Sequence, residues 1–146
     1  MKINDLLKTK GGNVITVNQN RSVYDAIKVL FENKIGAVLV NNDNEDVIGI
    51  ISERDILREC YRDSDKLKDV QIKDVMTREL IVGEPEDEIS YVKQVMIENR
   101  IRHLPVIDND KLTGILSMRD IVEAELTKVK LENRQLKELI KGKKAE

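Results

Sequence analysis

An internal repeat runs through this chain and limits the folds open to it. Residues 49–56 read Gly-Ile-Ile-Ser-Glu-Arg-Asp-Ile, and residues 114–121 read Gly-Ile-Leu-Ser-Met-Arg-Asp-Ile, so six of eight positions are identical. Self-similarity at a fixed period says more about a fold than any single short motif does. The copies lie 65 residues apart. That period is too long for a helical solenoid unit and suits a small α/β half-domain.

The repeat extends to both sides of this octapeptide and predicts the domain organisation. Matching segments follow one another in the same order in both copies: 3–7 with 72–76, 15–17 with 81–83, 23–30 with 89–96, and 33–40 with 99–106. Residues 62–69 are charged and non-periodic, and we interpret them as the linker. We expect a first repeat at 1–63, a second repeat at 64–122, and a C-terminal amphipathic helix with a basic tail at 123–146.

Hydrophobic periodicity predicts strand, helix, strand, strand and helix in each copy. The first copy has a strand at 14–17, a helix from the N-cap Ser22 to about Asn33, strands at 37–40 and 47–51 around a polar turn, and a helix after Ser52. The second copy has a strand at 80–82, a helix at 86–99, a hairpin turning at 108–110, and a helix after Ser117. The expected fold class is mixed α/β, with two βαββα repeats.

Each copy places a serine at the end of a strand and an aspartate three residues later, in a helix start. These are Ser52 with Asp55, and Ser117 with Asp120. A helix N-terminus favours an anion such as phosphate, and an aspartate carboxylate only accepts hydrogen bonds, which suits a vicinal diol. Together they fit the ribose and phosphate of a nucleotide. The same spacing also describes a capping box that binds nothing, and the sequence leaves both readings open.

An arginine stands directly before each of these aspartates, at Arg54 and Arg119. Capping has no use for an arginine there, whereas a guanidinium can contact phosphate through two hydrogen bonds. The alternative is an arginine on a solvated helix face, and it stays open.

Composition argues against nucleic-acid and membrane partners. The net charge is −2 and aromatic residues make up 3% of the chain, so a basic stripe and stacking platforms are both lacking. The sequence shows no apolar run long enough to cross a bilayer and no signal-like start. We expect a cytoplasmic protein.

Enzyme chemistry also finds little support in the sequence. Cys60 is the only cysteine and His103 the only histidine, and they belong to different predicted elements, so we expect an inert thiol, no nucleophilic site and no metal site. A Gly-rich phosphate loop is missing. The acidic run at 84–88 stands at a predicted helix start, where acids oppose the helix dipole favourably. We predict no catalytic residues.

These motifs resemble those of the cystathionine-β-synthase (CBS) domain, over about residues 1–122. The resemblance rests on Gly-hydrophobic-hydrophobic-Ser-x-x-Asp in both copies, on the opening at 74–77, Asp-Val-Met-Thr, and on the strand at 102–106, Arg-His-Leu-Pro-Val. It implies two units related by a pseudo-two-fold axis, each a sheet flanked by helices with one adenosine-nucleotide cleft. In such clefts the serine contacts phosphate and the aspartate holds the ribose hydroxyls.

The resemblance also implies an adenine slot in each copy, built from the end of the first strand and the start of the second. The matching positions are Thr16, Val17, Ile35, Gly36 and Ala37 in the first copy, and Val82, Gly83, Ile101, Arg102 and His103 in the second. Basic residues at the start of the second strand often reach phosphates. The copies differ there, since Gly36 and Ala37 stand opposite Arg102 and His103, so we expect unequal clefts. His103 is either a phosphate contact or a packed strand histidine.

The C-terminal segment carries a short heptad pattern. Leu126, Asn133 and Ile140 fall at a, and Val122, Val129 and Leu136 at d, with Glu125 and Glu132 at g facing Lys130 and Lys137 at e of a parallel partner. This pattern predicts a homodimer through paired helices. A helix folded back over a CBS unit is the open alternative.

The resemblance implies a stand-alone regulatory module with no tightly bound cofactor. It would bind AMP, ADP, ATP, S-adenosylmethionine or NAD reversibly and signal by a conformational shift to a regulated protein, unknown from the sequence. The alternatives are a constitutive dimerisation or scaffold module with vestigial clefts, and a regulatory piece of an enzyme or transporter.

Overall fold

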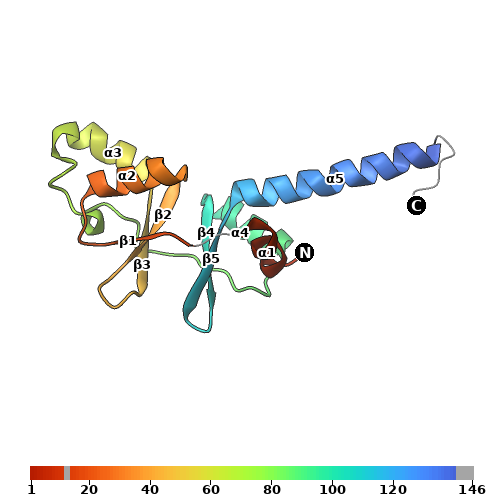
Figure 1. Ribbon diagram of the computed structural model, residues 1–146, viewed down its shortest axis with the longest axis horizontal. Helices are drawn as coiled ribbons and strands as arrows, with labels where there is room; N and C mark the ends of the chain where they lie inside the picture. Colours follow the sequence, from red (N-terminus) through yellow and green to blue (C-terminus); the bar gives the residue numbers. More distant parts are fainter. Residues whose placement is uncertain (12–13, 141–146) are drawn as a thin grey trace.

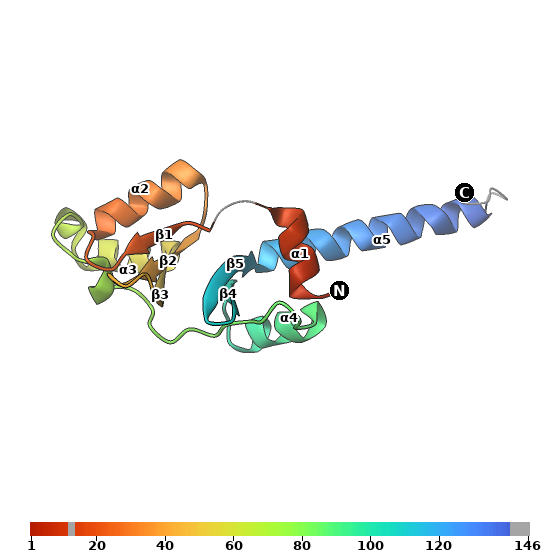
Figure 2. The same cartoon turned by 60° about the horizontal axis from the view of Figure 1, so that its bottom comes forward.

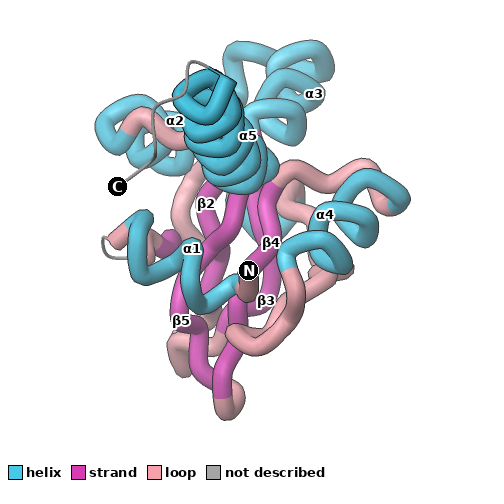
Figure 3. The backbone as a smooth tube through the Cα atoms, turned by 90° about the vertical axis from the view of Figure 1, so that its right-hand side faces the viewer, coloured by secondary structure: helices cyan, strands magenta, loops and turns pink. Residues whose placement is uncertain are grey.

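A computed structural model describes residues 1–11 and 14–140 of the chain, and the predicted basic tail lies outside the described residues. The fold holds two small sheets side by side, each with its own helices (Figure 1). Viewed along the last helix, the strands of both repeats lie in the middle with the helices around them (Figure 3). The prediction of a pair of α/β repeats followed by a C-terminal helix is confirmed.

The first repeat forms a three-stranded sheet in the order β1-β2-β3. Strand β1 (Thr16–Asn18) runs parallel to β2 (Ala37–Asn41), and helix α2 (Val23–Asn33) connects them. Strand β3 (Val47–Ser52) pairs antiparallel with β2 through a hairpin and leads into α3 (Glu53–Asp63). A 3₁₀ turn, η1 (Ser64–Lys66), follows inside the predicted linker. The apolar faces of α2 and α3 cover one side of this sheet (Figure 1).

The second repeat has the same order of elements with a reduced first strand. Helix α4 (Ile89–Glu98) precedes the antiparallel hairpin of β4 (His103–Asp108) and β5 (Lys111–Ser117). The predicted strand at 80–82 is wrong, because pairing is confined to one parallel bridge between Gly83 and Val106. Pro85 stands two residues further on and carries no N–H to extend a ladder. The helix predicted to start at residue 86 begins at Ile89 instead.

The opening segments of the two repeats exchange places. Helix α1 (Ile3–Lys10) buries Ile3 and Leu6 in the core of the second repeat. The 3₁₀ turn η2 (Ile72–Asp74) and the residues after it bury Ile72 and Met76 in the core of the first. Each repeat therefore completes its hydrophobic core with a segment from the other. The boundary at residue 63 stays a prediction about sequence units, since the packed units cross it.

Helix α5 (Met118–Ile140) is one continuous helix that joins the end of the second repeat to the C-terminal segment. Ile121 is buried in the second core, while the later turns extend away from both repeats (Figures 1 and 2). The alternative of a helix folded back on a CBS unit is therefore not what the structure shows. Among residues 1–11 and 14–140, no helix is both long and apolar enough to cross a membrane.

Candidate functional site

The two predicted Ser-x-x-Asp motifs form matching helix starts. In the first repeat, the backbone N–H of Ser52 donates to Asp55 Oδ2 at 2.9 Å, and the Asp55 N–H donates to Ser52 Oγ at 3.4 Å. In the second, the corresponding distances for Ser117 and Asp120 are 2.8 Å and 3.0 Å. Both motifs are thus capping boxes. In each carboxylate it is Oδ2 that accepts the hydrogen bond of the cap.

A third capping box in the chain gives a useful comparison. Ser22 and Asp25 at the start of α2 make the same two hydrogen bonds, at 3.4 Å and 3.1 Å. Hydrogen bonds from Ser22 and Arg21 outweigh burial there, so the pKa of Asp25 lies below its ordinary value. Asp55 differs in burial: it is the one charged residue within the buried set of the described chain, at 5% exposure. Capping alone does not call for that burial.

In both repeats a backbone hydrogen bond joins the start of the second helix, α3 or α5, to the residue just before strand β2 or β4. The Glu53 N–H donates to the carbonyl of Gly36 at 3.0 Å, and the Met118 N–H donates to the carbonyl of Arg102 at 2.8 Å. Strand register adds the pairs Ala37 with Ser52 and His103 with Ser117. The structure therefore brings the predicted phosphate and ribose contacts beside the predicted slot positions 35–37 and 101–103.

The other predicted adenine-slot residues, at 16–17 and 82–83, are not brought to the helix starts in the same way. Thr16 pairs in register with Leu39, two residues along β2 from Ala37, and Val17 is buried in the first core. These two residues line a separate cavity of about 470 Å³ with Asn18 and Arg21. Val82 is exposed, and Gly83 is buried where α1 crosses it. The assignment of these four residues to adenine slots stays a prediction.

The second helix start has a neighbour that the sequence pattern did not indicate. Lys10, the last residue of α1, donates from Nζ to Asp120 Oδ2 at 2.8 Å and to the carbonyl of Ile115 at 2.9 Å. Burial raises the pKa of Asp120, but the hydrogen bonds from Lys10 and Ser117 outweigh it, so this pKa lies below its ordinary value. Asp55 instead has Arg58 of its own helix at 3.6 Å.

His103 lies where the two repeats meet. A Cβ added at Gly36 would lie 3.8 Å from His103 Cε1 and 3.4 Å from Glu53 Oε1. Burial lowers the pKa of His103 below its ordinary value, Lys10 and Arg102 lower it further, and Asp120 and Glu53 oppose the shift. Neutral imidazole is therefore favoured, and it can donate one hydrogen bond from one ring nitrogen and accept one at the other. Its role as phosphate contact or packed histidine stays open.

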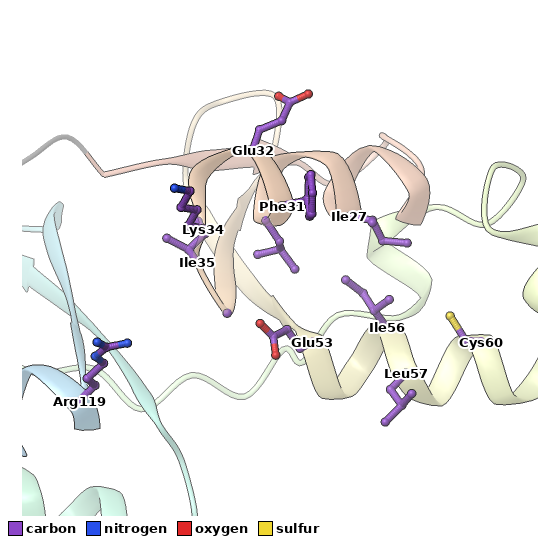
Figure 4. Close-up of a pocket in the computed structure, with 12 residues that line it drawn as sticks. Ile27, Phe31, Glu32, Lys34, Ile35, Glu53, Ile56, Leu57, Cys60 and Arg119 are labelled. Atoms are coloured by element: carbon purple, nitrogen blue, oxygen red, sulfur yellow. The ribbon is translucent and has the colours of Figure 1, made fainter.

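The two predicted arginines differ in their surroundings. Arg54 is exposed on α3. Arg119 ion-pairs with Glu123 at 3.0 Å and reaches the end of a cavity of about 880 Å³ between α2 and α3 of the first repeat (Figure 4). Apolar side chains such as Phe31 and Leu57 line most of this cavity, and Glu53 stands at the same end as Arg119 (Figure 4). Sequence reasoning missed both this cavity and Lys10.

Within residues 1–11 and 14–140, no group of three or more His, Cys, Asp or Glu side chains could hold a metal ion.

Comparison with protein families matches residues 3–62 and 72–127 to the CBS domain. The chain belongs to the CBS domain family. The predicted resemblance is confirmed.

Two relatives match this chain over most of its length, one in sequence and one in structure. The chain is 34% identical over 148 residues to the CBS domain-containing protein CBSX3, mitochondrial, of Arabidopsis thaliana, covering 96% of this chain and 72% of that protein. The crystal structure of the CBS-domain-containing protein ATU1752 from Agrobacterium tumefaciens superposes with a TM-score of 0.82 at 31% identity, covering 86% of this chain and 99% of that one.

Solved structures of CBS pairs include complexes with adenosine-containing ligands. The crystal structure of CBSX2 in complex with AMP matches this CBS pair with a TM-score of 0.71 at 28% identity, covering 86% of this chain and 96% of that chain. An adenosine nucleotide is thus a ligand of a CBS pair with this fold.

Proposed function

We propose that this CBS pair is a regulatory module that binds an adenosine-containing ligand at the helix starts of its two repeats. The candidate ligands are AMP, ADP, ATP, S-adenosylmethionine and NAD. Asp55 and Asp120 would accept hydrogen bonds from the ribose hydroxyls, and Ser52 and Ser117 would contact phosphate. A hydrogen bond to a charged group contributes about 1.5–3 kcal/mol, so each carboxylate accounts for roughly 10- to 150-fold in affinity.

The duplicated helix start carries this proposal. In both repeats a serine and an aspartate occupy the first turn of a helix whose first N–H is bonded to the start of the neighbouring strand. The positive end of the helix dipole at such a start favours an anion. The complex of CBSX2 with AMP supports the choice of ligand class.

Phosphorylated ligands should bind more tightly than adenosine. Around the second helix start stand two cationic side chains, Lys10 and Arg102, together with His103, whose neutral form is favoured. The first helix start has Arg119 nearby, at the cavity end beside Glu53. Unequal affinities of the two clefts follow from this difference in charge.

Signalling would proceed by population shift. A ligand that favours one relative orientation of the repeats changes the population of that state, and a partner protein reads the change. The exchanged opening segments bear on this mechanism, because movement of one repeat has to move α1 or η2 against the other repeat's core. A homodimer through α5 and cytoplasmic location remain parts of this proposal.

A scaffold module with vestigial clefts is the second candidate, favoured by the apolar residues left exposed on α5. Thermal unfolding with and without each nucleotide separates the two candidates, since a ligand that binds only the folded state stabilises it. At a ligand concentration of about 100 Kd the gain is about 2.7 kcal/mol, or roughly 5–10 °C for a chain of this size. Unchanged melting with every candidate ligand would favour the scaffold.

A further inference from the structure

The ammonium of Lys10 forms an ion pair with Asp120, the carboxylate that is proposed to bind the ligand in the second cleft. Its Nζ lies 2.8 Å from Asp120 Oδ2 and 2.9 Å from the carbonyl oxygen of Ile115. The side chain of Asp120 is only 20% exposed, and that of Lys10 is 37% exposed. The pair is therefore shielded more than an ordinary surface ion pair, and it uses two of the three ammonium donors.

Packing of α1 holds Lys10 in this place. Ile3 and Leu6 are buried in the second core, and Leu7 lies against Gly114, where an added Cβ would be 2.9 Å from Leu7 Cδ2. At the other end of the helix, Lys2 pairs with Glu86 at 2.7 Å. Because α1 is fixed along its length, the Lys10 side chain starts from a defined position beside Asp120.

The first cleft lacks this arrangement. Leu7 against Gly114 and Met76 against Gly49 are equivalent contacts in the two repeats. Beyond them the openings differ, because α1 continues as a helix to Lys10 whereas the chain after Met76 leaves the helical turn and Thr77 bridges Ile50. The nearest charged partner of Asp55 is Arg58 at 3.6 Å, from its own helix.

We propose that Lys10 competes with the ligand for Asp120 and thereby makes the second cleft selective for phosphorylated ligands. This inference rests on the proposed function. Adenosine has to displace the ammonium to reach the carboxylate and offers it no new partner. AMP brings a phosphate that the freed ammonium can pair with. At the first cleft Asp55 pairs with Arg58 of its own helix and not with a lysine from an opening helix, so we expect no such discrimination there.

Calorimetric titration with adenosine and AMP tests the competition. Lys10→Gln removes the ammonium, and Lys8→Gln, an exposed lysine on the same helix, is the matched control for net charge. Asp55→Asn in the background confines the measurement to the second cleft. We expect Lys10→Gln to tighten adenosine binding about 2- to 10-fold without tightening AMP binding, so that the preference for AMP shrinks. Lys8→Gln should keep the preference of the parent.

Lys10→Arg is the control for an effect on folding. It keeps the positive charge, so its affinities for adenosine and AMP should stay close to those of the parent. If Lys10→Gln binds adenosine with unchanged or lower affinity while Asp120→Asn abolishes binding, the competition is wrong and the proposed function stands. If neither adenosine nor AMP binds the parent chain at either cleft, the proposed function fails and the competition fails with it.

Discussion

Met76 lies on Gly49 so closely that a Cβ at Gly49 would stand 2.7 Å from Met76 Sδ. Leu7 and Gly114 form the equivalent contact, at 2.9 Å from Leu7 Cδ2. In both cases a residue from the opening of one repeat packs on the glycine that begins the octapeptide of the other. This glycine is therefore required by packing, since there is no room for a side chain beneath the exchanged segment.

Alanine at either glycine should destabilise the fold, and more strongly at Gly49. A Cβ there would also stand 2.9 Å from the Thr77 carbonyl, which belongs to the backbone and cannot move aside, whereas the contact at Gly114 is the end of a leucine side chain. Overpacking of this kind costs about 1–3 kcal/mol. Urea denaturation of both variants measures the difference.

Gly36→Ala is the control for these two variants, because its Cβ would meet only side chains, at 3.4 Å or more. It should leave the free energy of unfolding within about 0.5 kcal/mol of the parent. Equal losses at all three glycines would show that close packing of the exchanged segments is not the cause.

Stability should fall as the pH falls through the ordinary histidine range. His103 is the only histidine, and its pKa in the folded chain lies below the ordinary 6.5. The unfolded chain therefore binds a proton at a higher pH than the folded chain does, so stability is lost below 6.5 and levels off below the folded pKa. Lys10, Arg102, Asp120 and Glu53 are the charged groups that bear on it.

Urea denaturation at about pH 7.5 and about pH 6 measures this effect, with most carboxylates ionised at both values. In the His103→Gln variant, the free energy of unfolding should be the same at the two pH values. A variant that keeps the full pH dependence of the parent would exclude His103 as its source.

The extended part of α5 should hold a dimer together. Residues at the predicted seam are exposed there, at 51% for Leu126, 49% for Val129 and 57% for Leu136. Leu136→Asp should weaken the assembly, because it would bury an unpaired charge between helices. Gln135→Asp adds the same charge one residue away from the seam and is the matched control. Light scattering over a range of concentrations reads the dissociation constant.

The structure changes one detail of this prediction. Glu125 pairs within the chain with Lys93 at 2.6 Å, which leaves Glu132 with Lys137 of a partner helix as the better cross-pair. A chain ending at Thr127 keeps the Glu125–Lys93 pair and removes most of the seam. If this chain and Leu136→Asp both retain the mass of the parent, α5 is not a dimer element.

Local patterns in the sequence predicted local structure well. The N-cap at Ser22 and the hairpin turn at 108–110 appear in the structure as expected. The capping boxes at Ser52 and Ser117, one of the two readings left open, are also present. Asn109 and Asp110 have φ of 50° and 63° in that turn, values that asparagine and aspartate tolerate better than most residues. Such features depend on residues a few positions apart.

Contacts between distant segments were not predicted. The alignment of 3–7 with 72–76 showed that both openings are alike, but it did not show that each packs on the opposite repeat. The pair of Lys10 with Asp120 joins residues 110 positions apart, and no pattern in either segment points to the other. The predicted strand at 80–82 failed for a different reason, because pairing there is confined to the bridge of Gly83 with Val106.

Removal of the two cleft carboxylates, one at a time, separates ligand binding from helix capping. Asp55→Ala, Asp120→Ala and Asp25→Ala each delete the acid of a capping box, and each should lower stability by about 0.5–2 kcal/mol. Asn at the same positions, which keeps an acceptor for the cap, serves where alanine unfolds the chain.

Calorimetry with the tightest-binding adenosine ligand then compares the three variants. The proposed function predicts that Asp55→Ala and Asp120→Ala each lose binding at one cleft by roughly 10- to 150-fold, while Asp25→Ala binds like the parent. If all three variants bind like the parent, both cleft carboxylates are helix caps alone, and the proposed nucleotide site is wrong.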